Sequence, residues 1–112
     1  MSFMGMVYNK EGQSEHMTSK QRAYLKGLAM NMDPIFHVGK ASVTPEFVEG
    51  IREALEKREL IKIGVLKNCT DDPNILANLI AERSGAQVVQ VIGKKIILYK
   101  ESRNNKKIML PK

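Results

Sequence analysis

The sequence GAQVVQVIGKKIILYK, residues 85–100, contains two β-favouring runs separated by a turn signal. Valine and isoleucine dominate both runs, so residues 88–92 and 95–100 are predicted to be strands. The intervening Gly93-Lys94 suits a tight hairpin, because glycine readily takes the positive φ that such turns require. Gly85 is suited to end a preceding helix. The stretch therefore predicts the end of a helix followed by an antiparallel pair of strands.

Upstream of this hairpin, helical and strand patterns alternate. Three stretches have apolar residues at helical spacing: residues 19–30, those that follow Thr44-Pro45, and those from Pro73 to Gly85. Two short apolar runs, 35–38 and 60–66, favour buried strands. Strands joined through helices favour parallel pairing, whereas the last two must pair antiparallel. The fold class is therefore α/β with α+β character: a single compact domain in αβαβαββ order, with three helices on a mixed four-stranded sheet.

Each predicted helix begins at a recognisable capping signal. Thr18 and Gln21 have the spacing of a capping box. Thr44 precedes a proline at the first helical position, and either Asp71 or Asp72 does the same for the third helix.

The net charge of +6 is concentrated at the C-terminal end. Residues 93–112 hold one acidic residue, Glu101, and seven basic residues: Lys94, Lys95, Lys100, Arg103, Lys106, Lys107 and Lys112. A basic patch of this kind is typical of a protein with a polyanion partner. A solvated tail that improves solubility is an equally open interpretation. Membrane binding is disfavoured, because no basic amphipathic helix with large apolar residues adjoins the patch.

The chain is expected to have three regions. Residues 1–17 lack periodicity and are predicted to be a flexible leader, residues 18–100 to form the domain, and residues 101–112 to form a basic tail. No apolar run approaches the ~18 residues that cross a bilayer, and the leader lacks the apolar core of a secretory signal. Cys69 is the only cysteine and cannot form an internal disulfide, which fits a reducing compartment. A cytoplasmic monomer is the expectation.

Residue groups that would support catalysis or metal binding are not apparent. Cys69 is far in sequence from both histidines. His37, within an apolar strand, is expected to be a partly buried imidazole rather than a general base or a ligand. The pair Asp71-Asp72 is better explained by helix capping than by metal binding. We therefore expect no enzymatic activity, no metal and no cofactor.

The loop Gly39–Ser42, between the first predicted strand and the second predicted helix, has features of an anion site. N–H groups at a helix start carry partial positive charge. Gly39 allows the backbone to approach a phosphate closely, and Lys40 adds a full charge. Glu46 follows in the first turn of the helix, where it would complement the dipole and repel phosphate. An ordinary connection with a solvated lysine is therefore the alternative.

The aromatic content is low, with three tyrosines, three phenylalanines and no tryptophan. The paired aromatic strand motifs of the common sheet-based RNA-recognition module are absent, so binding would depend chiefly on phosphate contacts and shape. Tyr99, near Lys94 and Lys95, is the candidate for base stacking if its ring is exposed; half-buried packing is the alternative. Arg22 and Lys26 lie one helical turn apart and would extend a basic track.

Five segments of the chain resemble, in order, the YhbY family of bacterial proteins: KQRAYLKGLA, IFHVGKAS, LIKIGVL, GAQVVQVIGKKIILYK and KKIMLPK. Members of this family are free-standing versions of the domain named for chloroplast RNA splicing and ribosome maturation, the CRM domain. The resemblance implies a fold similar to the C-terminal domain of translation initiation factor three. It also implies RNA binding rather than catalysis, and association with precursors of the large ribosomal subunit.

The family's signature is a Gly-x-x-Gly loop, comparable to the phosphate-clamping loop of KH domains. In this sequence it falls on residues 39–42, where Gly39 and Lys40 match and Ser42 replaces the final glycine. Serine tolerates positive φ poorly, which argues against the closest backbone approach to phosphate. Its hydroxyl is expected instead to donate a hydrogen bond to phosphate.

The resemblance thus implies a ribosome assembly factor that binds ribosomal RNA of large-subunit precursors. Its candidate RNA-binding residues are Arg22, Lys26, Gly39, Lys40, Ala41, Ser42, Lys94, Lys95, Tyr99, Lys100, Arg103, Lys106 and Lys107. Three alternatives remain: an adaptor whose basic tail docks an acidic protein partner, an enzyme that acts on RNA, and a DNA-binding protein.

Overall fold

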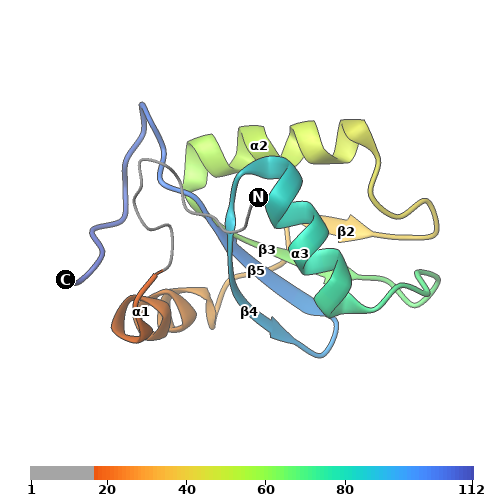
Figure 1. The fold of residues 1–112 in the computed structure, drawn as a ribbon, viewed down its shortest axis with the longest axis horizontal. Helices are drawn as coiled ribbons and strands as arrows, with labels where there is room; N and C mark the ends of the chain where they lie inside the picture. Colours follow the sequence, from red (N-terminus) through yellow and green to blue (C-terminus); the bar gives the residue numbers. More distant parts are fainter. Residues whose placement is uncertain (1–16) are drawn as a thin grey trace, which may run out of the picture.

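The computed structural model describes residues 17–112, so the predicted leader lies outside the described residues except for Met17. The elements follow the predicted αβαβαββ order (Figure 1): α1 (Ser19–Ala29), β2 (Phe36–Val38), α2 (Pro45–Arg58), β3 (Leu60–Val65), α3 (Pro73–Ser84), β4 (Gln87–Ile92) and β5 (Lys95–Tyr99). Within residues 17–112, no helix has the length and apolar character needed to span a bilayer.

The four strands form the predicted mixed sheet, in the order β2-β3-β5-β4. β2 and β3 are parallel, and β4 and β5 form the predicted antiparallel hairpin. The turn of the hairpin contains Gly93, whose φ is 54°. β3 and β4 are also joined through a helix, yet they do not pair, because β5 lies between them and pairs antiparallel with β3. The last strand of the chain is therefore in the interior of the sheet.

The predicted caps begin all three helices. Thr18 and Gln21 form the capping box, with an N–H···O distance of 3.0 Å in each direction. Thr44 caps α2 through its hydroxyl. For α3 the cap is Asp72, whose carboxylate accepts a backbone N–H. Asp71, the alternative cap, has a different hydrogen bond, described below.

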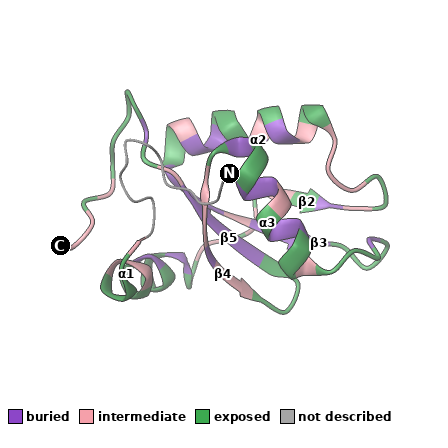
Figure 2. Cartoon of the chain, viewed as in Figure 1, coloured by how far each residue is buried: buried purple, intermediate pink, exposed green. Residues whose placement is uncertain are grey.

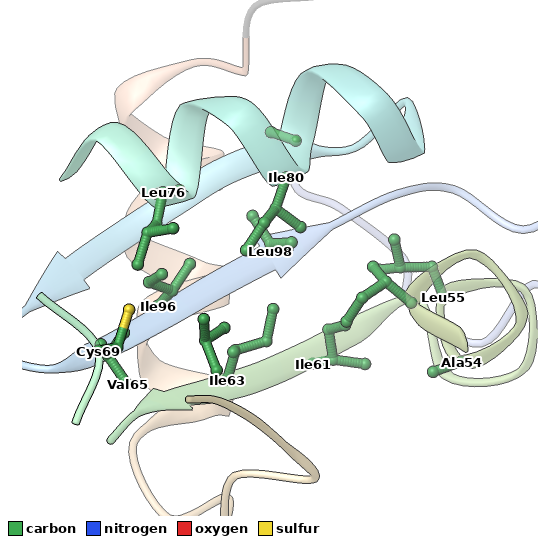
Figure 3. Packing of buried hydrophobic residues seen from close by; sticks show 14 residues of the cluster. Ala54, Leu55, Ile61, Ile63, Val65, Cys69, Leu76, Ile80, Ile96 and Leu98 are labelled. Carbon is green, nitrogen blue, oxygen red and sulfur yellow. The ribbon is translucent and has the colours of Figure 1, made fainter. Parts of the chain in front are cut away.

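One face of the sheet packs against α2 and α3 and encloses the main core (Figure 2). Side chains of both helices meet those of the strands there, as Figure 3 shows: Leu55, Ile61, Ile63, Leu76, Ile80, Ile96 and Leu98. Cys69 is buried in the same cluster. The Cys69 side chain is thus part of the main core.

The opposite face of the sheet packs against α1. Leu25 and Ala29 of α1 contact a second apolar cluster formed by Leu60, Val89, Ile97 and Tyr99. With 11 residues, α1 is about 16 Å long. It covers one end of this face and leaves the other end, near the β4–β5 turn, without a helix (Figure 1).

Strand β4 contains an irregularity that α1 accommodates. The register between β4 and β5 shifts between Val88 and Gln90. Arg22 Nη1 donates hydrogen bonds to the carbonyl oxygens of Val88 and Val89, each at 2.7 Å. Two carbonyls of the irregular segment are therefore satisfied by one guanidinium of α1.

The segment 101–112, predicted as a basic tail, is folded against the domain. Glu59, the C-cap of α2, is fully buried and has a φ of 67°. Its carboxylate accepts hydrogen bonds from the N–H groups of Ser102, Lys107 and Ile108 at 2.7–2.8 Å. Glu56 accepts three more from the same segment. Ile108 and Leu110 pack against the α1 cluster.

The hydrogen bonds keep both carboxyl groups ionised. Burial raises the pKa of Glu59, but the three N–H donors and the Lys106 charge outweigh it, so the pKa lies below the ordinary 4.5. Hydrogen bonds from Asn104, Ser102 and Arg103 likewise lower the pKa of Glu56. The segment is therefore held by charge-assisted hydrogen bonds, which are stronger than neutral ones.

Candidate nucleic-acid interface

Two loops and a turn meet at one end of the sheet, which we call the loop end: residues 39–44, residues 66–72 and the turn 93–94. Parallel pairing places the ends of β2 and β3 together, and Leu66 N donates to the Val38 carbonyl at 2.9 Å. Val65 N donates to the Lys94 carbonyl at 2.8 Å, which places the hairpin turn beside β3. Four exposed lysines belong to this end or adjoin it: Lys40, Lys67, Lys94 and Lys95.

The loop Gly39–Ser42 is a tight turn with internal hydrogen bonds. Ser42 N donates to the Gly39 carbonyl at 2.9 Å, and Ser42 has a φ of 59°. The position thus has the left-handed backbone that the family loop assigns to glycine, and serine adopts it here. Lys40 and Ala41 are exposed at the tip of the turn.

The hydroxyl of Ser42 does not have the role expected from the sequence. Ser42 Oγ donates to Asp71 Oδ2 at 2.7 Å, so it is paired within the protein rather than available to phosphate. This hydrogen bond also offsets part of the strain of the left-handed conformation, which costs a non-glycine residue about 1–2 kcal/mol. Asp71 places a carboxylate beside the loop, where it opposes the charge of Lys40. The sequence did not indicate that Asp71 accepts the hydrogen bond of Ser42.

On the α1 face, the structure brings Lys26 and Lys95 together around a cleft of about 330 Å³. Lys62 lines the same cleft and was missed by sequence reasoning. The alternation of side chains along the strand LIKIGVL could have identified Lys62. Ile61 and Ile63 face the main core, so Lys62 must point to the opposite face.

His37 is exposed, so the prediction of a partly buried imidazole was wrong. Its ring lies over Gly64 of the neighbouring strand, where a Cβ would lie 2.9 Å from the His37 Cδ2 atom. Any side chain at position 64 would displace the ring. The glycine in β3 therefore provides the space for an exposed imidazole on the open part of the α1 face.

Two candidate RNA contacts from the sequence have structural roles instead. Tyr99 is only 4% exposed, because it packs under α1, so its ring cannot stack on a base as hypothesised. Burial, reinforced by the charges of Glu59 and Glu101, raises the pKa of Tyr99 to about 12. Arg22 is partly buried, and its Nη1 is bound to the β4 carbonyls, so part of its guanidinium has a structural role that the sequence did not indicate.

The remaining predicted contacts lie at the other end of the sheet. Lys100, Arg103, Lys106 and Lys107 follow β5 near Glu59, which immediately precedes β3. The six residues of β3 separate this region from the loop end by about 17 Å. Lys106 forms an ion pair with Glu101 at 3.0 Å. The predicted basic residues thus form two groups rather than one continuous track.

Comparison with known proteins adds an independent line of information. Residues 17–100 match the model of the CRS1/YhbY (CRM) domain family. The chain is 48% identical over 95 residues to the "Probable RNA-binding protein YqeI" of Bacillus subtilis, a match that covers 85% of this chain and 99% of that protein. It is 33% identical over 96 residues to an "RNA-binding protein" of Haemophilus influenzae, covering 86% of this chain and 96% of that protein.

A solved structure has the same fold. The solution structure of the Staphylococcus aureus protein SAV1595 superposes with a TM-score of 0.72 at 46% sequence identity. The superposition covers 86% of this chain and all of the Staphylococcus aureus chain.

Proposed function

The chain belongs to the CRS1/YhbY (CRM) domain family, and from this premise we propose that it binds RNA without catalysing a reaction. Its target is immature ribosomal RNA of the large subunit, on which it acts as a cytoplasmic assembly factor. Two relatives named as RNA-binding proteins support the choice of ligand. The resemblance to YhbY proteins supports the choice of ribosomal precursors.

The observation that carries RNA binding is the meeting of three connections at the loop end. The turn 39–42 projects Lys40 from the end of β2, and the hairpin adds Lys94 and Lys95 beside it. Exposed lysines around a short backbone turn suit phosphate groups, which they bind as point charges. Lys67, in the loop after β3, extends the group to four cations.

The electrostatic part of this proposal is tested by titrating a fluorescein-labelled single-stranded oligoribonucleotide at several salt concentrations. Contact with about four phosphates gives a slope of about −3 for log affinity against log salt. Lys40→Ala should weaken binding to unrelated sequences about equally, because phosphate contacts carry no sequence information. The matched control is Lys57→Ala, an exposed lysine in the last turn of α2, at the other end of the sheet. A slope near zero, or equal losses for the two variants, contradicts binding at the loop end.

The ribosomal target is tested by sedimentation of a cell lysate with and without RNase. Co-migration with large-subunit precursors but not with mature ribosomes, abolished by RNase, is the expected result. A protein that stays at the top of the gradient at low salt refutes stable ribosomal association. Association that survives RNase favours the adaptor alternative, in which Arg103, Lys106 and Lys107 dock an acidic protein.

A further inference from the structure

The open part of the α1 face has an apolar cleft. Buried Ala29 and Ile97 line it from beneath, and Met30 and Ile92 line it with side chains that are 74% and 56% exposed. Exposed apolar side chains that line a cleft together are a feature of ligand-binding grooves. A volume of about 330 Å³ is near the lower end of the range for small-ligand sites. The cleft is large enough for a single ring system.

Positive charge surrounds this apolar floor. Lys26 of α1, Lys62 of β3 and Lys95 of β5 all line the cleft, and none of the described residues that line it is acidic. The complementary ligand has a flat apolar part with anionic groups on either side of it. An unpaired nucleotide within a phosphate chain has this combination of groups.

The sheet register extends the surface beyond the cleft. Lys95 is in register with Ile92 on one side and with Gly64 on the other, and Gly64 is in register with His37. These four residues form a row across the sheet that spans about 14 Å, since neighbouring strands lie about 4.8 Å apart. The exposed ring of His37 lies at the far end of the row. Histidine is among the side chains on which unpaired RNA bases stack.

We propose that this surface is a base-binding subsite for single-stranded RNA. One base enters the cleft between Met30 and Ile92, the adjoining phosphates contact Lys62 and Lys95, and a neighbouring base stacks on His37. The proposal rests on the RNA binding proposed above and adds contacts to the bases, whereas the loop end contacts phosphates. It assigns a role to the part of the sheet that α1 leaves uncovered.

The test compares two probes, hexauridylate and a six-unit ribose-phosphate chain without bases. Replacing Met30 and Ile92 together with serine should weaken hexauridylate binding about fivefold or more, as should His37→Ala, because a stacked base contributes substantially to affinity. Both variants should bind the baseless chain within twofold of the wild type. Lys62→Gln should weaken binding of both probes. Met109→Ser is the matched control, because Met109 is 78% exposed and does not line the cleft.

The outcomes separate this inference from the proposed function. Hexauridylate binding that depends on Lys40 but is unaffected by the cleft and His37 variants overturns the subsite and leaves the proposed function intact. Equal losses on both probes for the serine variant overturn base insertion. If the wild-type protein binds neither probe at low salt, the proposed function fails, and the subsite fails with it. Thermal unfolding of each variant is the check that the substitutions leave the fold intact.

Discussion

Replacing Glu59 with glutamine removes the charge that holds the C-terminal segment while keeping the size of the side chain. In the folded protein, Oε2 accepts from Ser102 N, and Oε1 accepts from Lys107 N and Ile108 N. An amide keeps one acceptor oxygen and places an NH₂ donor at the other position. At least one backbone N–H of the segment then faces a donor, and the remaining hydrogen bonds lose their charge assistance.

The size of the loss follows from these contacts. A buried N–H without an acceptor costs about 1–3 kcal/mol, and a bond to a charged group exceeds a neutral one by about 1 kcal/mol. Because these effects are not additive, we expect the free energy of unfolding to fall by about 2–4 kcal/mol. For a chain of this size, that corresponds to a decrease in Tm of roughly 8–20 °C.

Thermal unfolding followed by circular dichroism measures the loss, and hydrogen exchange locates it. The amides of Ser102, Lys107 and Ile108 should exchange faster in Glu59→Gln than in the wild type. Glu53→Gln is the matched control, since Glu53 is an exposed residue of the same helix and should change stability by less than about 0.5 kcal/mol. A Tm of Glu59→Gln within about 2 °C of the wild type, with unchanged exchange, would refute the role of the carboxylate.

Three further expectations follow from the same contacts. The folded-state pKa values of Glu56 and Glu59 lie below 4.5, so their contribution to stability is present above that pH and is lost as the pH falls through the lower folded values. Urea unfolding between pH 7 and 3 should show this fall in the free energy of unfolding. Glu59→Gln should make the pH dependence flatter. Asp71→Asn keeps an acceptor for Ser42 but removes a charge beside the loop. RNA affinity should therefore rise about 1.4- to 5-fold at low salt, which corresponds to about 0.2–1 kcal/mol for an exposed charge. A loss of affinity in a binding titration would contradict this expectation. Absorbance at 295 nm should show a tyrosine ionisation step near pH 12 that is missing in Tyr99→Phe. The RNA affinity of this variant should stay within twofold of the wild type. A larger loss of affinity would restore Tyr99 as an RNA contact.

Local signals in the sequence predicted the elements, because each depends on residues close together in the chain. The capping box at Thr18, the proline after Thr44 and the glycine of the hairpin turn each determine a boundary by steric or hydrogen-bonding rules that act over a few residues. Strand order was harder to predict. Placing β5 between β3 and β4 depends on which strand buries the most apolar surface, and a continuous run such as Ile96–Leu98 only hints at a central position.

The candidate site was predicted less well, because its geometry depends on contacts distant in sequence. Lys40 and the hairpin lysines were identified from their loops, and the structure places them at the same end of the sheet. Tyr99 was misjudged because its burial depends on α1, which lies about seventy residues earlier in the sequence. The pairing of Ser42 with Asp71 and the burial of Glu59 arise in the same way. The family loop pointed to a left-handed backbone at Ser42, but the burial of Glu59 has no signature in the residues that flank it.

The hydrogen bonds of Arg22 have a consequence for how copies of the chain meet. β4 lies at the edge of the sheet, and an edge strand offers unpaired backbone groups to which a strand from another molecule can add. The irregular register at Val88–Gln90 twists that edge. The guanidinium of Arg22 also binds two carbonyls of β4, which are then not available to another strand. A basic side chain first interpreted as a ligand for RNA thus occupies backbone acceptors of an edge strand, the kind of covering that opposes edge-to-edge pairing.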